Sequence, residues 1–112
     1  MKNVRLLASI AAGSVLLSAT ALAQEVDKKA ERAWKAKCAS CHGQTGKGDT
    51  DKGKQMKVKD MSAADFQAKK DDELKAGITN GVKWEGGDMP AFKDLTPDQV
   101  TGLVGLIRTF KK

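Results

Sequence analysis

One stretch, K-C-A-S-C-H-G at residues 37–43, limits what this chain can fold around more than any other feature. It holds the only two cysteines of the chain, Cys38 and Cys41, and its only histidine, His42. Thiolate and imidazole groups are ligands that bind soft and borderline metals readily. Three kinds of site are compatible with this stretch alone: a redox dithiol, part of a zinc site, or the attachment point of a cofactor.

Residues 1–23 have the features of a secretory signal peptide. A short basic head precedes an uncharged, mostly apolar segment that ends in Ala21-Leu22-Ala23, with small residues at the two positions that a signal peptidase recognises. We expect cleavage after Ala23, export to the periplasm, and a mature domain over residues 24–112. The alternative is an uncleaved membrane anchor, which usually needs about 20 predominantly apolar residues. This segment is slightly shorter and is diluted by serine, threonine and glycine.

The charge of the mature chain argues against nucleic acid as a partner. Loss of Lys2 and Arg5 with the signal peptide lowers the formal net charge from +6 to +4. The remaining basic residues are spread along the chain without interleaved aromatic residues, unlike the concentrated charge of a nucleic-acid binder. No other segment is apolar enough to span a bilayer, so we expect no stable membrane insertion of the mature protein. We also expect a monomer.

Export would place both cysteines in an oxidising compartment, where a free Cys-x-x-Cys pair tends to close into a disulfide. That disulfide would enclose only two residues and would stabilise the chain very little. A small domain with few large apolar side chains usually needs an additional stabilising element. An apolar cofactor in the middle of the fold would contribute far more than the disulfide.

Periodicity and capping signals predict an all-α domain. Apolar residues recur at helical spacing before Cys38. Ser62 and Asp65 form a capping-box pattern, and T-P-D-Q from Thr96 forms a clearer one with proline at the first helical position. The predicted helices cover residues 27–40, 62–70, 71–80 and 96–112, with loops at 43–59 and 81–92 and no strand.

Of the three kinds of site, cofactor attachment fits the chain best. A structural zinc site usually needs four nitrogen or sulfur ligands, and no further cysteine or histidine exists. A thioredoxin-like dithiol belongs in an α/β pattern, which this chain lacks. Cys-x-x-Cys-His is the attachment motif of c-type haem, in which two thiols add to the two vinyl groups and the adjacent His42 binds the iron. One motif and one histidine predict one haem and exclude bis-histidine ligation.

The sixth ligand of the iron must then be a methionine, another weak donor, or nothing. Met56 and Met61 flank a charged stretch, and we expect them to fill gaps against the haem or the core. Met89 lies in a loop far from the motif in sequence, so the chain can bring it to the opposite haem face. Pro90 stiffens the backbone beside it, and two preceding glycines allow close approach to a flat ring.

These residues resemble those of class I c-type cytochromes, which are small monohaem bacterial electron carriers. The resemblance covers residues 25–112 and rests on four segments: A-x-x-x-W-x-x-x-C-A-S-C-H from Ala30, G-Q-T-G-K-G-D from Gly43, M-P-A-F from Met89, and L-T-P-D-Q-V from Leu95 through Ile107-Arg108. It implies a cytochrome c fold, with several helices wrapped around one covalently bound haem c and the first and last helices crossing face to face. It also implies that Cys38 and Cys41 are the covalent anchors, and that His42 and Met89 are the axial ligands.

The chain departs from this family in two places. Leu106 stands where the last helix usually carries an aromatic residue, and we expect the nearby Gly102 and Gly105 to allow close contact with the first helix at a cost in helix stability. Many relatives also have a proline after the motif whose carbonyl orients the histidine. No proline lies between His42 and Pro90, so a backbone carbonyl of residues 43–60 is expected to take this role.

A His/Met pair fills both axial positions of the iron, so we expect an electron carrier and not an enzyme. The soft thioether favours ferrous iron and raises the reduction potential relative to bis-histidine ligation. The alternatives are a haem-based NO or CO sensor, if the methionine is labile, and a dedicated cytochrome subunit of one periplasmic oxidoreductase.

Further residues are candidates for contacts with the haem or with partners. The possible haem contacts are Met56, Met61, Trp84, Pro90 and Phe92. Trp84 either belongs to the core of its loop or donates a hydrogen bond from its indole N–H to a haem propionate. The lysines after the motif are either a solvated surface or a docking face for acidic redox partners, which bind transiently. These lysines are Lys47, Lys52, Lys54, Lys57 and Lys59.

Overall fold

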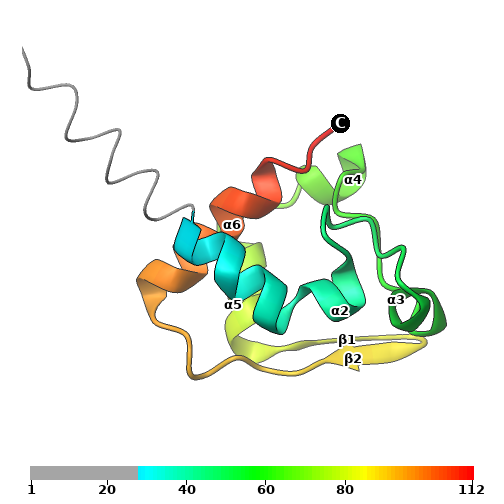
Figure 1. Ribbon diagram of the computed structural model, residues 1–112. Coiled ribbons are helices and arrows are strands. Elements are labelled where there is room, and N and C mark those ends of the chain that lie inside the picture. Colours follow the sequence, from blue (N-terminus) through cyan, green and yellow to red (C-terminus); the bar gives the residue numbers. More distant parts are fainter. Residues whose placement is uncertain (1–27) are drawn as a thin grey trace, which may run out of the picture.

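The computed structural model describes residues 28–112, so the predicted signal peptide and its cleavage site lie outside the described residues. Residues 28–37 are helical, and they are followed by α2 (Ala39–His42), α3 (Asp51–Gln55), α4 (Ala64–Gln67), α5 (Asp71–Asn80), β1 (Val82–Trp84), β2 (Gly87–Met89) and α6 (Pro97–Arg108) (Figure 1). The domain is mainly helical, as predicted. Within residues 28–112, no helix combines the length and apolar character that crossing a membrane requires.

The last helix, α6, begins where the sequence predicts. The hydroxyl of Thr96 accepts a hydrogen bond from the backbone N–H of Gln99 at 3.2 Å, and the Gln99 side chain accepts one from the N–H of Thr96 at 2.8 Å. This capping box satisfies two donors that a helix start leaves free. The helix ends at Arg108, whose guanidinium donates to the carboxylate of Asp71 at 2.7 Å and thereby joins α6 to the start of α5.

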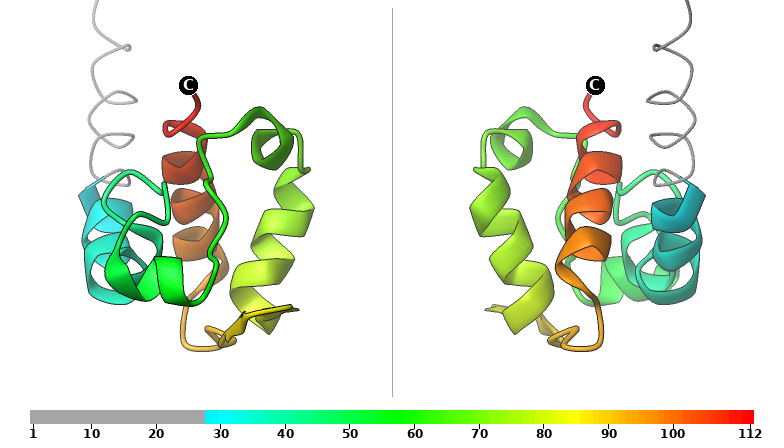
Figure 2. Two further views of the ribbon diagram at one scale, coloured as in Figure 1. Left: turned by 90° about the vertical axis from the view of Figure 1, so that its right-hand side faces the viewer. Right: turned by 90° about the vertical axis from the view of Figure 1, so that its left-hand side faces the viewer.

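The core is built around α6. Figure 2 shows α6 with the helix of residues 28–37 on one side and α5 on the other. The buried cluster that joins the three helices contains Trp34, Leu74, Ile78, Val100, Leu103, Val104 and Ile107. Trp34 also packs against Phe110 in the turn just after α6, and their ring centroids are 5.1 Å apart. The contact between the first and last helices that the family resemblance implies is therefore present.

The segment predicted as one loop over residues 43–59 contains a helix, α3. Thr50 is its N-cap, and the Thr50 hydroxyl accepts a hydrogen bond from the N–H of Gly53 at 2.9 Å. A β-carbon placed at Gly53 would lie 2.8 Å from the carbonyl oxygen of Gly48 and closer still to that of Cys41. Glycine therefore lets α3 pack with its backbone directly against α2, and a composition rich in glycine and lysine conceals this from sequence analysis.

The prediction that the chain has no strand is wrong. Strands β1 and β2 form an antiparallel hairpin inside the segment predicted as a loop, with Val82 opposite Met89 and Trp84 opposite Gly87. Two residues, Glu85 and Gly86, connect the strands, and Gly86 has a φ of +114°. Each strand is only three residues long, which is too short for an alternating apolar pattern to stand out.

Two further predictions about helices are wrong. Helix α4 begins with Ala63 as its N-cap and has no side-chain cap, because the hydroxyl of Ser62 donates to the carboxylate of Asp60 instead. Gly105 does not contact the first helix, since a β-carbon placed there would have no neighbour within 4 Å. Gly105 therefore lies on the open face of α6.

Candidate cofactor-binding site

The Cys-x-x-Cys-His residues occupy their own short helix, α2. The sequence predicts one helix through residue 40, but Cys38 leaves helical geometry, with a φ of −121°, and becomes the N-cap of α2. The N–H of His42 donates to the carbonyl of Cys38 at 2.9 Å, and Gly43 ends the turn with a φ of +80°. Both thiols are free and half-buried.

The imidazole of His42 is half-buried and lies against Trp34. The two ring centroids are 5.7 Å apart, and the indole N–H of Trp34 donates to the carbonyl of Gly43 at 3.0 Å. Burial lowers the pKa of His42, which favours the neutral imidazole that binds metals. Among the described residues, His42 Nδ1 is the single buried side-chain nitrogen or oxygen without a hydrogen-bond partner. The structure therefore does not contain the predicted bond to a carbonyl of residues 43–60.

The Cys38 thiol has an unusual proton affinity. Burial raises the pKa of Cys38 to about 11, against the opposing effect of the Lys37 charge and with a smaller raising effect of Cys41. A buried thiolate is disfavoured because its charge is removed from water. Cys38 is therefore a neutral thiol in the closed chain at neutral pH.

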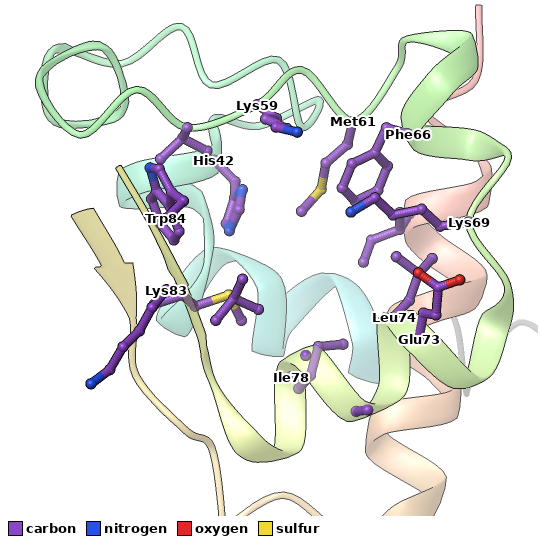
Figure 3. Close-up of a pocket in the computed structure, with 16 residues that line it drawn as sticks. His42, Lys59, Met61, Phe66, Lys69, Glu73, Leu74, Ile78, Lys83 and Trp84 are labelled. Atoms are coloured by element: carbon purple, nitrogen blue, oxygen red, sulfur yellow. The ribbon is translucent and has the colours of Figure 1, made fainter. Parts of the chain in front are cut away.

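Two adjoining cavities lie beside α2, with volumes of about 570 and 380 Å³. They share four wall residues, His42, Val58, Trp84 and Met89, so we describe them together as the crevice. Cofactor sites typically have volumes of about 300–1,000 Å³ and mostly apolar walls. Figure 3 shows His42 pointing into the larger cavity, with Met61, Phe66 and Ile78 facing it from other elements.

The crevice brings together the predicted site residues from both halves of the chain. The smaller cavity is lined by Cys38, Cys41, His42, Met56, Trp84, Met89, Pro90 and Phe92, and Met61 lines the larger one. Helix α2 and its N-cap supply the two thiols and the imidazole. The β1–β2 hairpin and the segment after it supply Trp84, Met89, Pro90 and Phe92. Segments that are distant in sequence thus form one site.

Met89 reaches the crevice at the end of β2, where it pairs with Val82 of β1. Its side chain is half-buried and lines both cavities. The segment after Met89 is fixed by the N–H of Phe92, which donates to the carbonyl of Ile78 at 3.0 Å. The hairpin therefore carries the Met89 thioether from the end of α5 to the crevice wall.

The other methionines and Trp84 have distinct surroundings. Met61 is a core residue with 7% exposure, as well as part of the wall of the larger cavity. The indole N–H of Trp84 donates to the backbone carbonyl of Met56 at 2.8 Å. This bond corresponds to the loop-core alternative for Trp84, because its one donor is directed to the protein rather than left for a propionate.

The lysines after the motif all lie on the surface. Lys47, Lys52, Lys54, Lys57 and Lys59 are exposed, and none belongs to an ion pair within residues 28–112. Only Lys52 and Lys59 also line the crevice, one at each cavity. The structure therefore places two of the five next to the candidate site and the other three elsewhere on the same segment.

The residues of the crevice fit an apolar group that carries its own metal better than they fit a bare ion. Nowhere in the described part of the chain do three or more histidine, cysteine or acidic side chains come close enough to hold a metal ion. Two thiols and a neutral imidazole instead border a large apolar space, which is the donor set and the setting that a covalently attached haem needs.

Sequence reasoning missed most of the apolar wall. Val58, Phe66, Leu74 and Ile78 line the larger cavity, and none was identified as a site residue. Leu74 and Ile78 are four positions apart on α5, so helical periodicity places them on one inward face. Helical periodicity cannot distinguish a core position from a cavity wall. Leu74 and Ile78 in fact belong both to the core cluster and to the wall of the larger cavity.

The fold and the crevice define a small c-type cytochrome. The chain belongs to the family described as cytochrome c oxidase, cbb3-type, subunit III, whose model matches residues 25–107. Among solved structures it is similar to the KustC0563 c-type cytochrome, with 30% identity, a TM-score of 0.64, and coverage of 74% of this chain and 98% of that chain. A comparison with curated proteins found no significant match. The predicted cytochrome c fold is confirmed, and membership of this class implies covalently bound haem c and haem-based electron transfer.

Proposed function

We propose that the protein is a one-electron carrier in which Cys38 and Cys41 hold one haem c by thioether links, and His42 and Met89 are the axial ligands. When bound, the haem supplies a ferric/ferrous couple. One observation carries the proposal: His42 and Met89 come from distant segments, yet both border both cavities of the crevice. Two protein ligands leave no open axial position, so we do not expect an enzyme.

The walls of the crevice support this role. Met61, Phe66, Leu74 and Ile78 keep water away from the site and lower the local dielectric constant. A low dielectric disfavours the additional positive charge of ferric iron, so it raises the reduction potential. The Met89 thioether acts in the same direction, because a soft ligand favours ferrous iron.

The ligand assignment is tested by the optical spectrum of the matured protein. A pyridine haemochrome assay reports thioether-linked haem, and the weak far-red band of ferric haem reports methionine ligation. Met89→Ala is expected to remove the far-red band, whereas Met61→Ala, which removes another thioether from the crevice wall, is expected to retain it. Loss of the band in Met61→Ala alone would overturn the assignment.

Binding of CO to the reduced protein distinguishes a carrier from a gas sensor. A carrier with a stable methionine ligand binds CO slowly, because Met89 must first leave the iron. A rapid shift of the main haem absorption band after addition of CO would instead favour the sensor alternative.

We also propose that the mature protein is a periplasmic monomer that begins after Ala23. The pattern A-L-A at residues 21–23 supports this location. Periplasmic extraction followed by amino-terminal sequencing and size-exclusion chromatography tests it. A membrane-bound product that retains residues 1–23 would contradict the proposal.

We propose that the exposed lysines bind acidic redox partners. Lys52 and Lys59 border the crevice, so an acidic protein that docks there approaches the cofactor. The rate of electron transfer to such a partner is expected to fall with added salt. Lys52→Glu with Lys59→Glu should lower this rate at low salt, whereas Lys29→Glu, an exposed lysine outside the crevice, should have little effect.

A dedicated subunit role is a second candidate, and the description of the matching family as an oxidase subunit supports it. The chemistry at the iron would be the same, but the partner would be fixed. Co-purification of the protein with a terminal oxidase in mild detergent would favour this role, and a freely migrating protein in the periplasmic extract would favour the mobile carrier.

A further inference from the structure

We propose that Trp84 is a positioning residue, which holds Met89 at the crevice through its hydrogen bond to the carbonyl of Met56. The inference rests on the proposed function in one respect, because it takes Met89 as the axial ligand. Trp84 itself belongs to β1 and stands two pairs away from Met89 in the register of the hairpin. It therefore acts on Met89 through the hairpin backbone and not by coordinating the iron.

The acceptor of the bond is available because it lies at a helix end. Met56 is the C-cap of α3, and the last carbonyls of a helix have no partner within the helix. The chain leaves α3 through Lys57, whose φ of 55° is the left-handed conformation common after a helix C-terminus. Trp84 Nε1 donates to the Met56 carbonyl at 2.8 Å, so the hairpin side chain caps α3.

Close packing surrounds this bond. Gly87 lies opposite Trp84 in the hairpin, and a β-carbon placed at Gly87 would be 3.3 Å from both Met56 Cε and Trp84 Cζ2. At the turn, a β-carbon placed at Gly86 would be 3.1 Å from the side chain of Lys57. The outer end of the hairpin thus rests on the two residues that follow α3.

Few hydrogen bonds hold the hairpin, although Met89 also packs against the core cluster. Among the described residues, the bond from Trp84 to Met56 is the only hydrogen bond between residues 82–89 and the rest of the chain. Two-stranded hairpins are marginally stable alone, and these strands have three residues each. Loss of the bond therefore frees the end of the hairpin while its base stays joined to α5 through Phe92 and Ile78.

Helix α3 also connects the hairpin to the segment that carries the motif. The hydroxyl of Thr50 lies 2.8 Å from the carbonyl oxygen of Ser40 and 3.2 Å from that of Cys41. One end of α3 is thereby bonded to α2, and its other end is bonded to Trp84. The hairpin that bears Met89 is held in place relative to the same segment that bears His42.

The test compares two substitutions in the haem-loaded protein, each of which removes one hydrogen bond from a side chain to a backbone carbonyl at a helix end. Trp84→Phe removes the bond to Met56 at the end of α3, and Thr109→Val removes the bond from the Thr109 hydroxyl to the carbonyl of Leu106 at the exposed end of α6, away from the crevice. The readouts are the far-red band of ferric haem and the rate at which added imidazole binds the iron, which requires Met89 to leave. Loss of one hydrogen bond is expected to raise this rate about fivefold in Trp84→Phe, with a weaker far-red band, and to leave both readouts unchanged in Thr109→Val.

An unchanged rate and band in Trp84→Phe, or an equal increase of the rate in Thr109→Val, would overturn the inference. If Trp84→Phe does not fold, Gly87→Ala decides, because the added methyl group presses between Met56 and Trp84 and should also raise the rate. Met89→Ala separates this inference from the proposed function. If Met89→Ala loses the band and Trp84→Phe does not, only the positioning role fails, whereas a band that survives Met89→Ala overturns both.

Discussion

The two sides of the crevice are held in different ways. On the α2 side, His42 lies against Trp34, which has 3% exposure and belongs to the same cluster as α5 and α6. On the hairpin side, Met89 is half-buried and its strand partner Val82 is 44% exposed. Segments with few buried contacts open locally at a lower free energy than the core. Although Met89 and Phe92 also pack against the core, we therefore expect the hairpin side to open more readily than the α2 side.

The largest expected difference concerns covalent attachment. Replacement of Cys38 and Cys41 together by serine is expected to abolish the thioether links completely, so that all haem is extracted by acidified organic solvent. Met89→Ala is expected to keep every link, because it changes only the hairpin side. The mass of the intact, denatured chain shows for each variant whether haem is covalently attached. Loss of haem from denatured Met89→Ala chains would contradict the expected difference between the two sides of the crevice.

The next difference concerns global stability. Trp34→Ala is expected to lower the free energy of unfolding by about 3–5 kcal/mol, since it empties a buried aromatic position in the core. Trp84→Ala is expected to cost less, because its ring is only half-buried. Urea denaturation of both variants measures this, and an equal or larger loss in Trp84→Ala would show that the hairpin belongs to the cooperative core.

A smaller effect is expected at the connection between the two sides. Thr50→Ala removes the N-cap of α3 and the hydroxyl next to the carbonyls of Ser40 and Cys41. We expect a loss of about 1 kcal/mol in the free energy of unfolding. Thr50→Ser keeps the hydroxyl and serves as the control, and a loss in the serine variant equal to that in alanine would exclude the hydroxyl as the cause.

The smallest expected effect concerns a residue outside both sides of the crevice, and it is a gain in stability rather than a loss. Gly105→Ala is expected to stabilise the protein by up to about 1 kcal/mol, because α6 gains helix propensity and a methyl group there meets no neighbour. Gly53→Ala is the contrasting variant, since its methyl group would collide with backbone oxygens of the α2 side. The midpoint temperature of thermal unfolding should rise in Gly105→Ala and fall in Gly53→Ala.

Local sequence signals predicted those parts of the fold that depend on neighbouring residues. The start of α6 was predicted to the residue because Thr96, Pro97 and Gln99 form the cap among themselves. The thiols and His42 were also predictable as one site, because the motif is contiguous. The approach of Met89 to the crevice was inferred from its distance from the motif in sequence and from Pro90 beside it, and the resemblance to a family implied the same residue.

Structure that depends on distant contacts was missed. Helix α3 contains Gly53 and lysines, and its stability comes from packing against α2, which no local pattern reports. The T-D pair at residues 50 and 51 was the available signal, since threonine caps helices and aspartate favours a first turn. The partner of Trp84 could not be predicted either, because the Met56 carbonyl is brought to it by the same unforeseen helix.

The half-buried thiol of Cys38 bears on the order in which this protein matures. Its pKa of about 11 leaves almost no thiolate at neutral pH, and the thiolate is the reactive form of cysteine. On the proposed assignment of Cys38 as a haem anchor, a chain that closes before it meets haem would hold this thiol in its protonated, less reactive form. On this assignment, we expect haem attachment to be faster on an open chain, in which both thiols are in water, than on a closed one.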